Sequence, residues 1–246
     1  VVPREKIEDY IEEADCVLIG PGMLRAEGAI SNFKFQISNL KELEDIEDEG
    51  LQTYLLTQYL LLRYSSKRWV IDAGALQMME PEWLSQLHGN VIVTPHKGEF
   101  DRLFGHVILG SGATPESIKH RDYIDPGQAR MTDGKVQEFT KRYNCIVLLK
   151  GQEDIICSPS ECVKVTGGNA GMTKGGTGDV LAGLVAALAC KNELFLSACA
   201  GSFINKKAGD ELFKRVGYYF NSSDLVDEIP KVMRSLFPSL IAFESS

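Results

Sequence analysis

The chain has 246 residues, of which 44% are hydrophobic, and its 34 acidic against 26 basic side chains give a net charge of −8. This composition is typical of a globular protein and is far from that of a disordered chain. The acidic balance excludes a general nucleic-acid binder, because such a protein needs a basic face to neutralise phosphates. A local phosphate site remains compatible with it, because backbone N–H groups at a helix start attract anions.

The longest apolar stretch, residues 180–190, is too short to span a bilayer, and no signal peptide is visible, so we expect no membrane association. Six cysteines are scattered along the chain without a Cys-x-x-Cys pair or a histidine at ligand spacing. We therefore expect reduced thiols in a cytoplasmic protein, with neither a zinc site nor a disulfide framework. Because the chain starts at Val1 rather than Met, we also expect that an N-terminal part precedes it.

Helical and strand patterns alternate along the chain. Ile7, Tyr10, Ile11 and Ala14 recur at helical spacing, and further helices are predicted over residues 51–64, 135–143 and 180–188. Short β-branched runs predict strands over residues 16–19, 69–71, 91–93, 145–149 and 154–157. Residues 105–133 show no hydrophobic periodicity of a helix or a strand, which predicts a surface loop. The alternation predicts parallel strands joined by crossover helices in an α/β fold.

Glycines or polar residues follow four of these strands directly. In open α/β sheets, ligands bind outside the carboxyl ends of the strands. Four successive strand ends of this kind therefore predict a binding site at one edge of the sheet. The four segments are Gly20-Pro21-Gly22, Asp72-Ala73-Gly74, Thr94-Pro95-His96-Lys97-Gly98-Glu99 and Lys150-Gly151.

A glycine-rich stretch, residues 167–178, precedes the apolar helix and is followed by Asp179. Glycines before a helix allow backbone N–H groups to surround an anion, and the helix dipole favours negative charge there. The stretch is not a Walker A loop, because Lys174 is followed by Gly175 rather than by Ser or Thr. It predicts a phosphate site in which Asp179 takes a proton from an attacking hydroxyl. The alternative is a turn in which Asp179 only caps the helix.

The residues from Asn169 to Gly183, Asn-Ala-Gly-Met-Thr-Lys-Gly-Gly-Thr-Gly-Asp-Val-Leu-Ala-Gly, closely resemble the signature of the NAD(P)H-hydrate dehydratases of the ribokinase-like superfamily. The four strand ends agree with that family in order and spacing, although Leu24 and Gly74 depart from it. The resemblance implies a three-layer α/β/α sandwich with a mostly parallel sheet. It also implies one domain over residues 1–246 that lacks the family's N-terminal strand–helix unit.

The activity implied by the resemblance is the repair of NADH hydrate or NADPH hydrate. A phosphoryl group from ADP or ATP is transferred to the C6 hydroxyl of the (6S) hydrate, and phosphate then leaves. ADP is the expected donor and ATP the alternative, because the signature looks like the bacterial and archaeal form. The superfamily's usual Mg²⁺ is expected as a cofactor, without a direct protein ligand, and Glu99 would contribute to it only indirectly.

The resemblance also assigns roles to residues of this chain. Asp179 would be the catalytic base, and Gly22 and His96 would line the hydrate pocket beside it. The adenine nucleotide would be bound by the segment after the fourth strand and by the glycine-rich stretch. These nucleotide-binding residues are Lys150, Gly151, Gln152, Glu153, Asp154, Asn169, Gly171, Met172, Thr173, Gly175, Gly176, Thr177 and Gly178.

Two other functions are compatible with the same residues. A ribokinase-like kinase for a sugar or a hydroxymethylpyrimidine would use the same Gly-x-Gly-Asp arrangement but release a phosphorylated product. A nucleotide-binding module without catalysis would keep the loop but need no base, so the presence of Asp179 argues against it. A homo-oligomer is compatible with the sequence, because exposed sheet edges would favour self-association.

Overall fold

The computed structural model describes residues 6–25, 36–108 and 133–236, which form a six-stranded sheet in the order β1-β2-β3-β4-β5-β6. The first four strands are parallel, whereas β5 is antiparallel to β4 and β6 is antiparallel to β5. The mostly parallel α/β architecture expected from the sequence is therefore confirmed. The strands are β1 (Cys16–Ile19), β2 (Arg68–Ile71), β3 (Val91–Val93), β4 (Ile146–Leu149), β5 (Asp154–Cys157) and β6 (Cys162–Val165).

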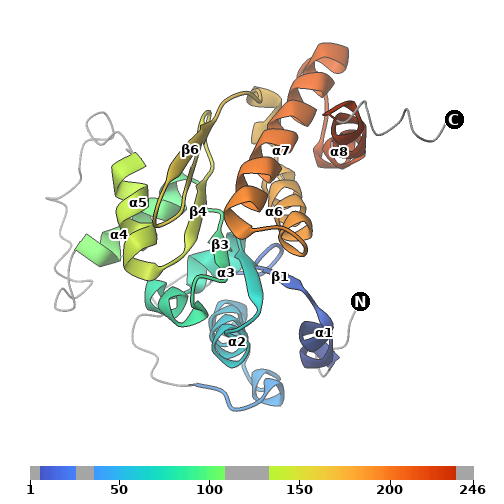
Figure 1. Ribbon diagram of the computed structural model, residues 1–246. Coiled ribbons are helices and arrows are strands. Elements are labelled where there is room, and N and C mark those ends of the chain that lie inside the picture. The colour runs from blue at the N-terminus through green and yellow to red at the C-terminus, as the bar shows by residue number, and fades with distance from the viewer. Residues whose placement is uncertain (1–5, 26–35, 109–132, 237–246) are drawn as a thin grey trace, which may run out of the picture.

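Helices cover both faces of the sheet and give the molecule three layers (Figure 1). The layer on one face contains α1 (Ile7–Glu13), η2 (Leu40–Leu43), α2 (Glu49–Arg63), α3 (Ala73–Met78), η3 (Pro81–Leu87), α4 (Lys97–Ile108) and α5 (Asp133–Tyr143). The other face is covered by α6 (Thr177–Ala189) and α7 (Leu194–Val216). α8 (Ser222–Leu236) packs outside these two, near η6 (Ala170–Thr173).

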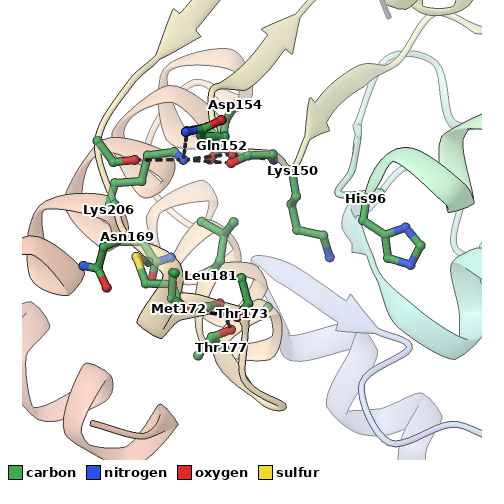
Figure 2. A pocket seen from close by; sticks show the side chains of 16 residues that line it. His96, Lys150, Gln152, Asp154, Asn169, Met172, Thr173, Thr177, Leu181 and Lys206 are labelled. Atoms are coloured by element: carbon green, nitrogen blue, oxygen red, sulfur yellow. Dashed lines mark hydrogen bonds and ion pairs between the residues drawn. The ribbon is translucent and has the colours of Figure 1, made fainter. Parts of the chain in front are cut away.

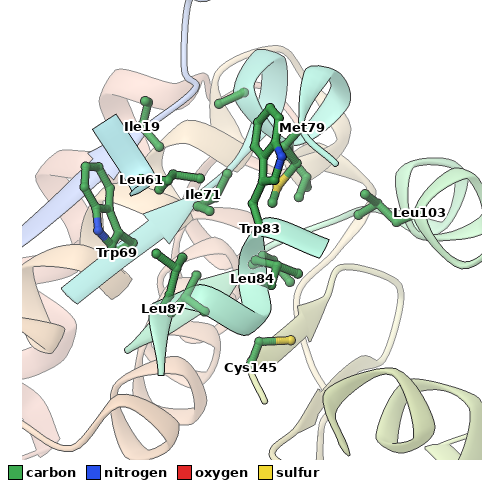
Figure 3. Close-up of a cluster of buried hydrophobic side chains, with 14 of the residues drawn as sticks. Ile19, Leu61, Trp69, Ile71, Met79, Trp83, Leu84, Leu87, Leu103 and Cys145 are labelled. Carbon is green, nitrogen blue, oxygen red and sulfur yellow. The ribbon is translucent and has the colours of Figure 1, made fainter. Parts of the chain in front are cut away.

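The central strands are buried on both faces, which explains their continuous apolar runs. On β2, Trp69 and Ile71 belong to the core under the first helical layer, whereas Val70 belongs to the core under α6 and α7. Figure 3 shows Trp69 and Ile71 in the first of these cores, together with Trp83 of η3. Alternation along each strand thus supplies both cores from one sheet.

The predicted strands agree with the structure to within one residue, since β2 starts at Arg68 and β4 at Ile146. β6 was not predicted, because it is a short edge strand with the exposed residues Val163 and Lys164 at its centre. The predicted loop over residues 105–133 is wrong at its start, where α4 continues to Ile108, and residues 109–132 lie outside the described part. None of the helices that the structure describes is long and apolar enough to cross a membrane.

The expectation that all six thiols are free is wrong for one pair. Cys157 and Cys162 lie opposite each other on β5 and β6, with their Cα atoms 4.1 Å apart, and form a disulfide. The pairing escaped prediction because β6 itself was missed. Cys16, Cys145, Cys190 and Cys199 are free. Burial raises the pKa of Cys16 to about 12 and that of Cys199 to about 11, so both thiols stay protonated near neutral pH and are poor nucleophiles.

Helices α6 and α7 approach closely because a glycine of α7 faces α6. A Cβ on Gly201 would lie 2.6 Å from Cγ2 of Val185, well inside van der Waals contact. Gly183, in the middle of α6, has open space where a Cβ would point. The two glycines therefore have opposite packing environments, although both lie inside helices.

We expect Gly201→Ala to lower the free energy of unfolding by about 1–3 kcal/mol, because the added methyl overpacks the α6–α7 contact. The matched Gly183→Ala variant should raise it by roughly 0.5–1 kcal/mol, since alanine is the better helix former and meets no neighbour. Urea unfolding of both variants checks this expectation. Equal stabilisation by the two substitutions would contradict the packing assigned to Gly201.

Candidate functional site

A cavity of about 670 Å³ lies at the carboxyl ends of β3 and β4, beside the start of α6 (Figure 2). This volume is typical of small-molecule and cofactor sites. Ten residues predicted from the sequence line the cavity: His96, Lys150, Gly151, Gln152, Asp154, Asn169, Met172, Thr173, Thr177 and Gly178. The lining residues not assigned from the sequence are Gly167, Gly168, Ala170, Leu181, Asn205 and Lys206.

The start of α6 forms one wall of the cavity. Gly176 is the N-cap and has the left-handed φ of 85°, which turns the loop into the helix at a position that favours glycine. The hydroxyl of Thr177 donates to the carbonyls of Met172, at 2.6 Å, and Lys174, at 2.8 Å, and so folds the loop back on the helix. The amides of the first turn lack intrahelical acceptors, which makes this wall attractive to an anion.

Two residues hold the glycine-rich loop against the connection between α7 and α8. The ammonium of Lys174 donates to the carbonyls of Tyr218 and Phe220 and lies 5.4 Å from the centre of the Phe220 ring. A Cβ on Gly171 would lie 2.6 Å from the same ring, so only glycine fits there. The loop is thus fixed from outside, and Lys174 does not line the cavity.

A second cation, Lys150, lies directly at the start of α6. Its Nζ is 2.7 Å from Oδ1 of Asp72 and 3.5 Å from the position that a Cβ on Gly178 would take. Asp72 is only 1% exposed, and its buried carboxylate fixes the position of the ammonium. Asp72 precedes α3 as its N-cap residue but makes no side-chain cap hydrogen bond. The pair therefore presents positive charge at the point where the helix already favours an anion.

His96 lies beside Lys150, because the segment after β3 pairs with the end of β4 (Figure 2). The amide of Glu99 donates to Nδ1 of His96 at 3.2 Å, which leaves the proton of the neutral ring on Nε2. The carboxylate of Glu99 accepts from the His96 amide at 2.9 Å and from Nε2 of Gln77 at 2.8 Å. The imidazole is thus oriented by its own turn, while 59% of its side chain stays exposed.

Not every predicted residue lines the cavity. Asp179 is the third residue of α6 and is exposed, and the interpretation of Asp179 as the N-cap is wrong because Gly176 has that position. Gly22 is also exposed, with a φ of 77° and open space around it. Four other predicted residues also lie outside the cavity lining: Glu153, Gly171, Gly175 and Gly176.

Lys206 of α7, which was not predicted, is central to the opposite wall of the cavity. It is 6% exposed, and its Nζ lies 3.2 Å from Oδ1 of Asp154. The same ammonium donates to the carbonyls of Gly151, Gln152 and Gly167 at 3.0–3.3 Å (Figure 2). Asp154 also accepts from the Gly151 amide and from Ser202 Oγ. This network joins the β4–β5 turn, the segment after β6 and α7 into one wall.

Residues 3–231 match the family model described as NAD(P)H-hydrate dehydratase. The chain is 32% identical over 229 residues to a bifunctional NAD(P)H-hydrate repair enzyme of Archaeoglobus fulgidus, covering 93% of this chain and 37% of that protein. It is 43% identical over 169 residues to an ADP-dependent (S)-NAD(P)H-hydrate dehydratase of Nitrosopumilus maritimus, covering 68% and 52%. The chain thus spans about half, or less, of the length of these relatives.

The fold is similar to that of a ribokinase-like superfamily protein from Enterococcus faecalis, whose crystal structure aligns with a TM-score of 0.64 at 22% identity. The alignment covers 92% of this chain and 65% of the other. The three-layer arrangement in Figure 1 is therefore the ribokinase-like fold.

We expect Lys206→Met to destabilise the protein by about 3–5 kcal/mol, because it leaves the buried carboxylate of Asp154 without its cation. The adjacent Lys207 pairs with Glu211 on the surface, at 3.2 Å, and Lys207→Met should change stability by less than about 0.5 kcal/mol. Urea unfolding of the two neighbouring variants measures the difference. A similar small loss in both would show that the Lys206 network contributes little.

Proposed function

Because the chain belongs to the NAD(P)H-hydrate dehydratase family, we propose that it restores NADH and NADPH from their hydrates with a nucleotide as phosphoryl donor. The observation that most supports this proposal is the position of Lys150, held by Asp72 beside Gly178 in the first turn of α6. One rim of the cavity then combines a cation with the amides of the first turn, and Asp179 lies exposed in the same turn, outside the cavity lining. The partners are small molecules, and we propose the cytoplasm as the place of action.

The nucleotide would bind in the cavity with its phosphates at the start of α6. Amides of the first turn, the helix dipole and the ammonium of Lys150 all favour negative charge there. These groups are fixed before the ligand arrives, so they can also stabilise the charge that develops on the phosphoryl group during transfer. The exposed side chains of His96 and Asp179 would face the hydrated nicotinamide at the open rim.

The proposed reaction has two steps. Asp179 takes the proton of the C6 hydroxyl while that oxygen forms a bond to the terminal phosphorus and the bond to the donor phosphate breaks. In the second step the lone pair of the ring nitrogen expels phosphate, with cleavage of the C6–O bond. Loss of a proton from C5 to solvent then forms the C5=C6 double bond and restores NADH or NADPH. Lys150 would neutralise charge on the phosphoryl group, and His96, whose Nε2 lies 3.5 Å from Oε1 of Glu99, would present its exposed ring to the hydrate.

The Mg²⁺ of the proposed reaction would be held mainly by the nucleotide phosphates. No group of three His, Cys, Asp or Glu side chains within the described ranges could hold a metal by itself. Both oxygens of Glu99 accept hydrogen bonds, from Gln77 and from the His96 amide, which fits the indirect role expected for Glu99. These residues fit an ion that arrives on the nucleotide, since Mg²⁺ at such sites keeps several waters and needs few protein ligands. When bound, the ion neutralises charge on the phosphates.

We expect Asp179→Asn to lower turnover about 10²–10⁴-fold while leaving the fold and ADP binding intact, because asparagine is nearly isosteric but cannot accept the proton. Asp179 is not the N-cap, so its loss removes only a favourable charge from the first turn, worth less than about 1 kcal/mol. The measurements are thermal shift with ADP, for binding, and the absorbance of reduced nicotinamide formed from hydrated NADH, for turnover.

Asp227→Asn is the matched control, since Asp227 is an exposed carboxylate on α8, and it should retain full turnover. Turnover of Asp179→Asn within about threefold of the parent, with normal ADP binding, would make Asp179 a structural residue. A stable phosphorylated product in place of NADH would instead indicate a small-molecule kinase of the same fold.

ADP is the proposed donor, in line with the name of the Nitrosopumilus relative, which calls that protein ADP-dependent. We therefore expect a higher initial rate on chemically hydrated NADH with ADP than with ATP at equal concentration. Comparing these two rates under identical Mg²⁺ concentrations decides between the donors, and a strong preference for ATP would overturn the assignment.

A further inference from the structure

The glycine-rich loop, residues 167–176, is attached to α7 as well as to α6. In its first half, the Gly168 amide donates to Oδ2 of Asp210 at 3.2 Å. The side-chain amide of Asn169 donates to the Gly209 carbonyl at 2.8 Å. Asp210 and Gly209 lie in the C-terminal part of α7, so this half of the loop follows the position of that helix.

The second half of the loop is attached to the connection between α7 and α8, residues 217–221. The ammonium of Lys174 donates to the carbonyls of Tyr218 and Phe220. Carbonyls just beyond the end of a helix suit a cation, because the helix dipole is negative there. A Cβ on Gly176 would lie only 2.9 Å from Oγ of Ser222. Neither Lys174 nor Phe220 lines the cavity, so both act on the loop and not on a ligand.

Lys174 also connects this attachment to the wall of the cavity that the start of α6 forms. Its backbone carbonyl accepts the hydroxyl of Thr177, the first residue of α6, at 2.8 Å. Lys150, by contrast, is held by Asp72 at the carboxyl edge of the sheet. The amides at the start of α6 and the cation that faces them are therefore carried by different parts of the fold. Their relative position depends on how the loop is anchored.

We infer that Lys174 and Phe220 are positioning residues, which hold the loop so that the amides at the start of α6 reach the phosphates of the nucleotide. Lys174 provides the hydrogen bonds to the connection. The Phe220 ring fills the space against Gly171, where a Cβ would lie 2.6 Å from it. A binding group that is displaced by about 1 Å can lose about 10²-fold in effect. This inference rests on the proposed nucleotide site but not on the identity of the phosphoryl acceptor.

The test compares the affinity for ADP with the affinity for adenosine, which lacks the phosphates. We expect Lys174→Met and Phe220→Leu each to lower the ratio of these two affinities by about 10- to 100-fold, because the amides are then misplaced. The affinity for adenosine itself should change by less than about threefold. Isothermal titration calorimetry, by displacement for the weaker ligand, gives both dissociation constants without any turnover. Lys174 is exposed, so Lys174→Met keeps the fold even if Phe220→Leu does not.

Two control variants separate positioning from a loss of charge and from a loss of packing. Lys214→Met removes a cation from the last turn of α7, where Lys214 pairs with Glu211 at 2.9 Å, and should keep the affinity ratio within about threefold. Val232→Ala removes an apolar side chain from the same core as Phe220, so it should lower the melting temperature and leave the ratio unchanged.

An undiminished ratio in Lys174→Met and Phe220→Leu would overturn the inference alone, and so would an equally large drop in Lys214→Met or Val232→Ala. Equal affinity of the parent protein for ADP and adenosine would overturn the proposed phosphate site, and the inference with it.

Discussion

The ion pair between Asp72 and Lys150 determines where the proposed phosphate site can be. The two residues follow β2 and β4, so the pair passes over the end of β3, and parallel alignment brings both strand ends to one edge. Burying a carboxylate is costly unless a cation compensates for it, and Lys150 supplies that charge with its Nζ at 2.7 Å. Asp72 holds the ammonium on one side, and the other side faces Gly178 in the first turn of α6.

Two lysine–aspartate pairs flank the cavity and serve different purposes. Lys150 is held by one oxygen of Asp72 and stays open to a ligand, with 21% of its side chain exposed. Lys206 is enclosed by Asp154 and three carbonyls, so it shapes the wall without offering a charge. The cavity therefore has one charged end, at Lys150, and one neutral end, at Lys206. This arrangement suits a nucleotide, which has phosphates at one end and a base at the other.

Sequence reasoning located the strands and the ligand loops because both have local signals, namely β-branched runs and glycines after strand ends. It missed Lys206 and Asn205, because a lysine and an asparagine inside a long helix look like surface residues until the opposing loop is placed. It also missed the Cys157–Cys162 bond, since β6 is a four-residue edge strand in which Val163 and Lys164 are exposed. The alternative that made Asp179 the N-cap was wrong by three positions, because the left-handed Gly176 starts the helix earlier than the apolar pattern indicates.

The contacts that build the cavity join residues far apart along the chain: Asp72 to Lys150 across 78 positions, Gly151 to Lys206 across 55 and Asp154 to Ser202 across 48. The β4–β5–β6 meander, by contrast, is held by strand pairs of short sequence separation. A chain that has folded only this meander has neither wall of the cavity. Nucleotide would therefore associate with the completed fold alone and stabilise it by mass action, which would make ligand concentration a determinant of the protein's cellular lifetime.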